Sequence, residues 1–140
     1  MIPSDITRYG IWKRANPDGQ VLSRDTGFFR NYNSIPYGGD LENIKPFFPV
    51  ANSDSRLDDN AYVIGIIVHG KARAYLFDAV KKMGEVIENF QGKTIVAKYV
   101  NEIDSVRIFE RGAGGLTQLS SVPSFWFSWV AVYPDTELYK

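Results

Sequence analysis

The last seventeen residues, Ser124 to Lys140, constrain the fold more than any other stretch of this chain. They hold its densest aromatic run, made of Phe125, Trp126, Phe127, Trp129 and Tyr133. Each such side chain removes about 150–250 Å² of surface from water when it is buried. The run therefore predicts a Trp-rich terminal helix, capped by Ser124, that dominates the core into which it packs.

A weaker copy of this pattern lies near the start of the chain. Residues Trp12–Leu22 and Trp129–Tyr139 both read Trp, four residues, Pro-Asp, two residues and then two large residues. We expect the two matching ends to pack as a pseudo-symmetric pair or to pair with another copy of the chain, which makes a homodimer one expected assembly.

Length and charge narrow the classes of function. The chain has 140 residues, with 16 basic and 16 acidic side chains, which favours a single domain over residues 1–140. A balanced charge argues against a nucleic-acid partner. The longest apolar runs are far shorter than the roughly 20 residues that cross a bilayer, so no membrane partner is expected. We also identify no signal peptide in these residues.

Cysteine and histidine usage bears on metals and cofactors. The chain has no cysteine and one histidine, His69, which excludes disulfides and cysteine-ligated metal centres and disfavours multi-histidine ones. We expect no metal site and no cofactor.

Strand signals dominate the second half of the sequence. Residues 62–68 and 71–76 flank His69-Gly70 and predict a β-hairpin. A short helix is expected at 77–83, and further strands at 85–90, 94–100, 103–109 and 116–122. Near the start, 4–15 predicts a short amphipathic helix ended by Pro17. The predicted fold class is α+β and β-rich, an antiparallel sheet or small partly open barrel with two or three short helices.

Residues 24–60 show neither helical nor strand periodicity. They are rich in Gly, Pro, Asn, Asp and Ser, with scattered aromatic residues such as Phe28 and Phe29. Such a long irregular segment predicts a loop that wraps over the surface, held by its aromatic side chains in pockets of the core.

Four short motifs resemble functional ones but lack essential parts. Gly92-Lys93-Thr94 lacks the upstream glycine of a phosphate loop, and Gly112–Gly115 lacks the third glycine of a dinucleotide fingerprint. The acidic segment 52–60 lacks the central glycine and terminal glutamate of a calcium loop. Asp25-Thr26-Gly27 has no second triplet of the aspartic-protease type, although a homodimer could supply one.

Polar groups beside aromatic residues form the remaining candidate site. If the 24–60 loop folds over the hairpin, these side chains could line a cleft, although arginines that only tie loop carbonyls in place are the more ordinary interpretation. The candidate ligand-binding residues are Asp25, Arg30, Tyr32, Tyr37, Arg56, His69, Arg73 and Tyr75. We expect His69 to be a solvent-exposed turn residue.

Many short motifs follow one another in order along nearly the whole chain, at residues 21–27, 30–32, 36–39, 48–50, 56–57, 63–65, 70–75, 125–129 and 134–139. Together they resemble the prokaryotic domain-of-unknown-function family 3179. Family members are usually longer, are often exported and have two related halves. The resemblance is to the second, cysteine-free half: where the first half carries a Cys-Pro-Leu-Cys-type motif, this chain has Tyr99-Val100-Asn101. The resemblance implies an exported or periplasmic location. A metal or redox role suggested by the cysteine motif does not carry over to this chain, and the family has no established activity to transfer.

Two functions from different classes remain open. The leading hypothesis is a non-catalytic ligand- or partner-binding or structural module of a larger or exported prokaryotic protein, with a small anion or a protein as its partner. The alternative is a small hydrolase-like enzyme that acts on an anionic substrate with Asp25 or His69, assisted by Arg73, whose planar guanidinium suits carboxylate or phosphate. No nucleophile, base and orienting group are legible together, which favours the binding module.

Overall fold

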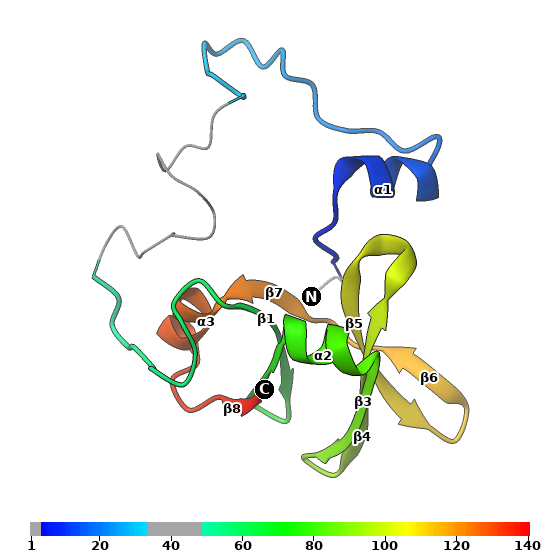
Figure 1. Ribbon diagram of the computed structural model, residues 1–140, viewed down its shortest axis with the longest axis vertical. Coiled ribbons are helices and arrows are strands. Elements are labelled where there is room, and N and C mark those ends of the chain that lie inside the picture. The colour runs from blue at the N-terminus through cyan, green and yellow to red at the C-terminus, as the bar shows by residue number, and fades with distance from the viewer. Residues whose placement is uncertain (1–3, 34–48) are drawn as a thin grey trace.

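A computed structural model describes residues 4–33 and 49–140 of the chain (Figure 1). The described part is rich in strands and contains three α-helices. The elements are, in chain order, α1 (Tyr9–Ala15), β1 (Tyr62–Val68), β2 (Lys71–Leu76), α2 (Phe77–Met83), β3 (Glu85–Phe90), β4 (Lys93–Val100), the 3₁₀ turn η2 (Asn101–Ile103), β5 (Ser105–Gly112), β6 (Gly115–Gln118), β7 (Val122–Phe125), α3 (Trp126–Val132) and β8 (Glu137–Tyr139). The fold is α+β and β-rich, with the expected Trp-containing helix near the C-terminus.

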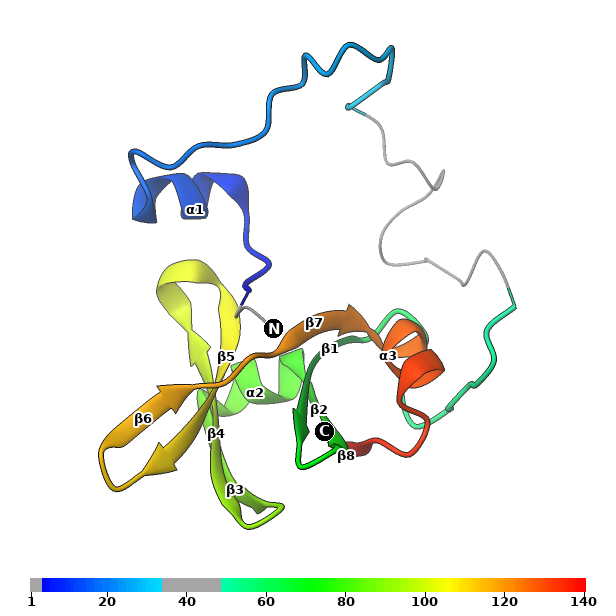
Figure 2. The same ribbon diagram turned by 180° about the vertical axis from the view of Figure 1, so that it is seen from behind.

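The strands form two four-stranded sheets. The first has the order β7-β1-β2-β8 and the second β3-β4-β5-β6. Neighbouring strands run antiparallel, except that β8 lies parallel to β2 at the edge of the first sheet. The two sheets are separate and do not close into a barrel, and α2 lies between them in the chain and in space (Figures 1 and 2).

Strand β1 is apolar on both faces because each face meets a different layer. Successive side chains of a strand point to opposite sides, so Ile64 and Ile66 join the core between the two sheets, with Tyr75, Ile95 and Ile108. The other face of the first sheet contributes Val63 and Ala74 to a second core, built around Trp126, Trp129 and Val130 of α3. The continuous apolar run in the sequence reflects burial on both sides.

Most element predictions in the second half are confirmed, and the differences are local. The hairpin turn has His69 at φ 49° and Gly70 at φ 77°, the left-handed pair of a tight two-residue turn. The segment predicted as one strand, 116–122, is the end of β6, a break and the start of β7.

The cap of the terminal helix is a correction. Ser124 pairs with Val63 across β7 and β1, so the backbone stays extended through Phe125 and α3 begins only at Trp126. The Ser124 hydroxyl donates to the Phe125 carbonyl and does not cap the helix.

Helix α1 and the chain that follows it stand away from the two sheets (Figure 2). Helix α1 begins at Tyr9, later than expected, and lies beside η2. Before the helix, Asp5 pairs with Arg107 of β5 at 2.7 Å. Because α3 packs instead against β1, the two matching ends do not pack as a pair. Phe28 and Phe29 are exposed, so the prediction that aromatic residues of the 24–60 loop are held in core pockets is wrong for these two.

Candidate functional site

Two of the candidate residues, Arg73 and Tyr75, lie on one face of β2 and meet carboxylates from other strands. The Arg73 guanidinium donates through Nε, at 2.8 Å, and Nη2 to the two carboxylate oxygens of Glu88 on β3. Its Nη1 donates to Glu137 on β8 at 2.9 Å, and the Tyr75 hydroxyl donates to Glu88 at 2.6 Å. We call Arg73, Tyr75, Glu88 and Glu137 the inter-sheet cluster, because β2 and β8 belong to one sheet and β3 to the other.

Burial and pairing fix the protonation of two members of this cluster, Arg73 and Tyr75. Burial and the hydrogen bond to Glu88 raise the pKa of Tyr75 well above its ordinary value, so the phenol keeps its proton. Burial alone would lower the pKa of Arg73, but the bonds to Glu88 outweigh it, and the net pKa is raised. The guanidinium also lies over the rings of Tyr75 and Phe90. The charged, doubly paired Arg73 ties the two sheets together, and neither Arg73 nor Tyr75 can move a proton near neutral pH.

Sequence reasoning missed Glu88 and Glu137. Residues 85–90 predict a strand, which places Glu88 on the same face as Val86 and Phe90, among apolar neighbours. A carboxylate on an inward face signals a cationic partner, and Arg73 is an arginine on a neighbouring predicted strand. Nothing in the sequence, however, indicates that β8 runs parallel to β2 and brings Glu137 to Arg73.

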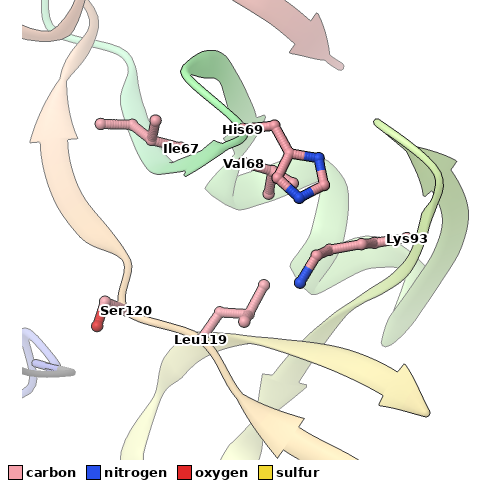
Figure 3. A pocket seen from close by; sticks show the side chains of 6 residues that line it. All are labelled: Ile67, Val68, His69, Lys93, Leu119 and Ser120. Atoms are coloured by element: carbon pink, nitrogen blue, oxygen red, sulfur yellow. The ribbon is translucent and has the colours of Figure 1, made fainter.

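His69 lies at the exposed tip of the hairpin, as expected. Figure 3 shows its imidazole and the Lys93 ammonium facing the same small cavity, of about 200 Å³. Ile67, Val68, Leu119 and Ser120 complete the lining. Lys93 pairs with Glu110 at 2.6 Å, which neutralises its charge. The cavity thus combines an imidazole with an already paired ammonium.

Arg56 belongs to a third place, beside the terminal helix. It pairs with Asp54 at 2.6 Å, donates to the Thr136 carbonyl at 2.9 Å and lies 5.3 Å from the centre of the Trp126 ring. The hydrogen bond from Arg56 lowers the pKa of the Asp54 carboxyl. Since the Trp126 indole also donates to the Asp54 carbonyl, Arg56 fastens residues 49–60 onto α3.

A broad surface concavity of about 690 Å³ lies beside Arg56 and is lined by Tyr62, Asp58, Asp78 and Lys140 among others. Among the described residues, the Tyr62 hydroxyl is buried without a hydrogen-bond partner. Burial raises the pKa of Tyr62 to about 12. A buried hydroxyl without a partner is unfavourable in the folded state.

We therefore expect Tyr62→Phe to stabilise the protein by about 1 kcal/mol, because it removes this hydroxyl and keeps the ring. The folded state holds the Tyr62 proton more tightly than the unfolded state, so stability should be full below about pH 10 and fall as the pH rises toward 12. Chemical denaturation between pH 8 and 12 would show a shallower fall for Tyr62→Phe. Tyr9→Phe, at an exposed position, is the control; an equal change in both variants would contradict the assignment.

The remaining candidates lie in the N-terminal segment, away from the inter-sheet cluster. Asp25 is exposed and its backbone N–H donates to Ser23 Oγ, while the hydroxyls of Tyr32 and Thr26 are hydrogen-bonded at 2.8 Å. Arg30 is exposed, and Tyr37 lies outside the described residues. The structure thus brings Arg73 and Tyr75 together, and places Arg56, His69 and the described loop candidates at separate positions.

Comparison with known families decides the relationship of this chain. The profile of DUF3179, described as a protein of unknown function, matches residues 1–136. The chain belongs to the DUF3179 family. Comparisons with curated proteins and with solved structures found no match.

DUF3179 membership supplies a family but no chemistry, so the described residues carry the functional argument. Among them, no group of three or more His, Cys, Asp or Glu side chains is arranged to hold a metal ion. In the same part of this DUF3179 chain, no helix is long and apolar enough to cross a membrane.

The most unusual surface of this DUF3179 domain is its exposed N-terminal apolar segment. Leu22 is 98% exposed and Phe29 fully exposed. Tyr9, Val21 and Phe28 are at least 60% exposed, and all of these residues lie within one stretch of chain that leaves the sheets. Several large apolar side chains exposed along one segment are a candidate interaction surface.

Proposed function

We propose that this chain is a non-catalytic module that binds another protein through residues 9–29, within a larger or exported prokaryotic protein. The observation that carries the proposal is the near-complete exposure of Leu22 and Phe29. Large apolar side chains gain roughly 1.5–3 kcal/mol each when they leave water. A partner that covers this segment would recover that free energy.

The contacts of Arg73 favour the binding module over the hydrolase. In a hydrolase of the proposed type, Arg73 would face an anionic substrate beside Asp25 or His69. Its guanidinium instead spends its donors on Glu88 and Glu137. A substrate anion would have to displace a bidentate carboxylate, so Arg73 serves the fold.

A small anion has one supporting observation, the cavity that His69 and Lys93 share (Figure 3). The Glu110 carboxylate already neutralises Lys93, which makes this cavity a weaker anion site than an unpaired lysine would. We therefore place a protein partner first.

The test is affinity capture from the source organism with the wild-type chain and with a Leu22→Asp/Phe29→Asp variant as the matched control. Both positions are exposed, so the variant should keep its stability to within about 0.5 kcal/mol. We expect at least one identified protein to bind the purified wild-type chain and to bind the variant at least about tenfold more weakly.

Capture that is equal for both chains would contradict the proposed interface. Thermal stabilisation by inorganic phosphate that is lost in His69→Ala, together with the absence of any partner, would replace the proposal with small-anion binding.

A further inference from the structure

The N-terminal segment repeats the terminal helix in three dimensions as well as in sequence. Helices α1 and α3 have seven residues each, and each has a tryptophan, Trp12 or Trp129, at its fourth position. The C-cap residues Asn16 and Tyr133 have nearly the same backbone angles, φ −133° and ψ 72° against φ −125° and ψ 71°. We call Tyr9–Leu22 the N-terminal unit and Trp126–Tyr139 the C-terminal unit.

Two backbone hydrogen bonds after the helix correspond between the two units. Each C-cap N–H donates to the carbonyl of its tryptophan at 2.9 Å. Three residues later, the N–H of Gly19 donates to the Asn16 carbonyl at 2.9 Å, and that of Thr136 to the Tyr133 carbonyl at 3.2 Å. Each tryptophan side chain also reaches the residue seven positions after it: a Cβ at Gly19 would overlap the Trp12 ring, and the Trp129 indole donates to the Thr136 hydroxyl. The two segments share the helix and the turn after it; the C-terminal unit continues into strand β8, whereas residues 20–22 of the N-terminal unit form no strand.

The C-terminal unit shows what such a segment does. Its strand β8 adds to the edge of β2, with Leu138 opposite Ala74. Its Trp129 ring covers Gly65 of β1, where any Cβ would overlap the ring. Gly65 and Ala74 are opposite each other in the hairpin, so two small residues leave the space into which the Trp129 ring packs. The unit closes the β1–β2 hairpin and buries Trp129 and Val130 to 2% and 1% exposure.

The N-terminal unit has a similar helix and turn, but it adds no strand to either sheet. No residue of α1 is buried, and Val21 and Leu22, which correspond to Leu138 and Tyr139, are 60% and 98% exposed. The β1–β2 hairpin of this chain is already filled by its own C-terminal unit. We propose that the N-terminal unit docks on a β-hairpin of the β1–β2 type in another domain of this fold, one whose hairpin lacks its own closing unit. This proposal rests on the proposed function and names its partner.

One substitution between the units specifies the partner further. Lys13 stands where Val130 is buried at 1% exposure. On a hairpin identical to β1–β2, docking would bury the Lys13 ammonium without a carboxylate, which is costly. Gln20 likewise replaces Glu137, which pairs with Arg73 in this chain. The partner is therefore a related domain rather than a second copy, with a small-residue pair for Trp12, an acidic group facing Lys13 and no arginine demanding a carboxylate.

Grafts within the full-length chain test whether the unit can close such a hairpin. Residues 129–139 are replaced by the sequence of residues 12–22 at equal length, once with Val130 retained and once with Val130→Lys. The graft that retains Val130 is expected to melt at least about 5 °C above the ungrafted Trp129→Ala chain. The Val130→Lys graft is expected to melt well below the graft that retains Val130. The Val130-retaining graft with Trp129→Ala is the control. A Val130-retaining graft that melts no higher than this control would overturn the proposal.

Docking between chains is tested by sedimentation velocity. The acceptor is the full-length Trp129→Ala chain, in which the Trp129 ring no longer covers Gly65, and the donors are the wild-type chain and Lys13→Val. We expect Lys13→Val to bind the acceptor and the wild-type donor to bind at least about tenfold more weakly. Equal binding by both donors would make the partner a second copy and overturn the role of Lys13. No binding by Lys13→Val, with a stable graft, would overturn docking between separate chains. If Trp129→Ala does not fold, the melting temperatures of the two grafts are compared with each other. A Val130-retaining graft that melts no higher than the Val130→Lys graft would then overturn the role of Lys13.

The two proposals fail in different ways. If the graft is stable but no partner is captured, the proposed function is contradicted, while the ability of the N-terminal unit to close a hairpin is still supported. If a partner is captured through Leu22 and Phe29 but the graft does not fold, the binding function is supported and the hairpin is contradicted as its target.

Discussion

Replacing Trp129 with alanine is expected to destabilise the fold by about 3–5 kcal/mol, the range for a large aromatic side chain deleted from a core. Trp129 is 2% exposed, packs against Tyr133 with ring centres 4.4 Å apart, and donates its indole N–H to Thr136. The substitution leaves a void over Gly65 and removes the indole donor from the Thr136 hydroxyl, which keeps its bond to the Glu137 carbonyl. Chemical denaturation monitored by circular dichroism measures the loss.

A cycle with Gly65 separates close packing from general loss of apolar surface. Gly65→Ala places a methyl group in the Trp129 ring, so it should be strongly destabilising alone and much less so in the Trp129→Ala background. Gly10→Ala is the control, since a Cβ there has open space and alanine favours helix by about 0.5–1 kcal/mol. Additive effects of Gly65→Ala and Trp129→Ala would mean that the ring and the glycine do not constrain each other.

Local signals in the sequence predicted the elements whose partners lie nearby in the chain. The β1–β2 hairpin follows from two apolar runs around His69-Gly70, and α2 ends at Gly84, at φ 77°, as its glycine indicates. The start of α3 was mispredicted because Ser124 is held extended by β1, some sixty residues earlier in the chain. The parallel pairing of β8 with β2 has no local signature, since it depends on how α3 returns the chain to the sheet.

The candidate site residues were likewise predicted only where local signals place them. Arg73 and Tyr75 are two residues apart on a strand, so the alternation alone places them on one face. Their partner Glu88 comes from the other sheet, and the periodicity of a strand does not predict which sheet packs against it. From the sequence repeat we expected the two matching ends to pack as a pair or with another copy. The structure gives them a similar helix and turn, but α1 lies beside η2 and α3 packs against β1, and the repeat itself carries no signal for which partner each helix meets.

Glu88→Ala is expected to cost about 3–5 kcal/mol, because it removes one partner of a largely buried ion pair. The Arg73 and Glu88 side chains are 14% and 20% exposed. Without Glu88, the guanidinium keeps only the more exposed Glu137, and the Tyr75 hydroxyl loses its acceptor. Thermal and chemical denaturation would both show the loss.

The matched control is Glu110→Ala, which breaks the more exposed pair with Lys93 and should cost no more than about 1 kcal/mol. The double variant Arg73→Met/Glu88→Leu removes both charges and should recover most of the stability lost in Glu88→Ala, since apolar residues can replace a buried pair at little cost. Recovery would mean that the inter-sheet cluster serves the fold. If Glu88→Ala keeps wild-type stability instead, the Arg73 guanidinium is available to an external anion, and the hydrolase alternative regains its central residue.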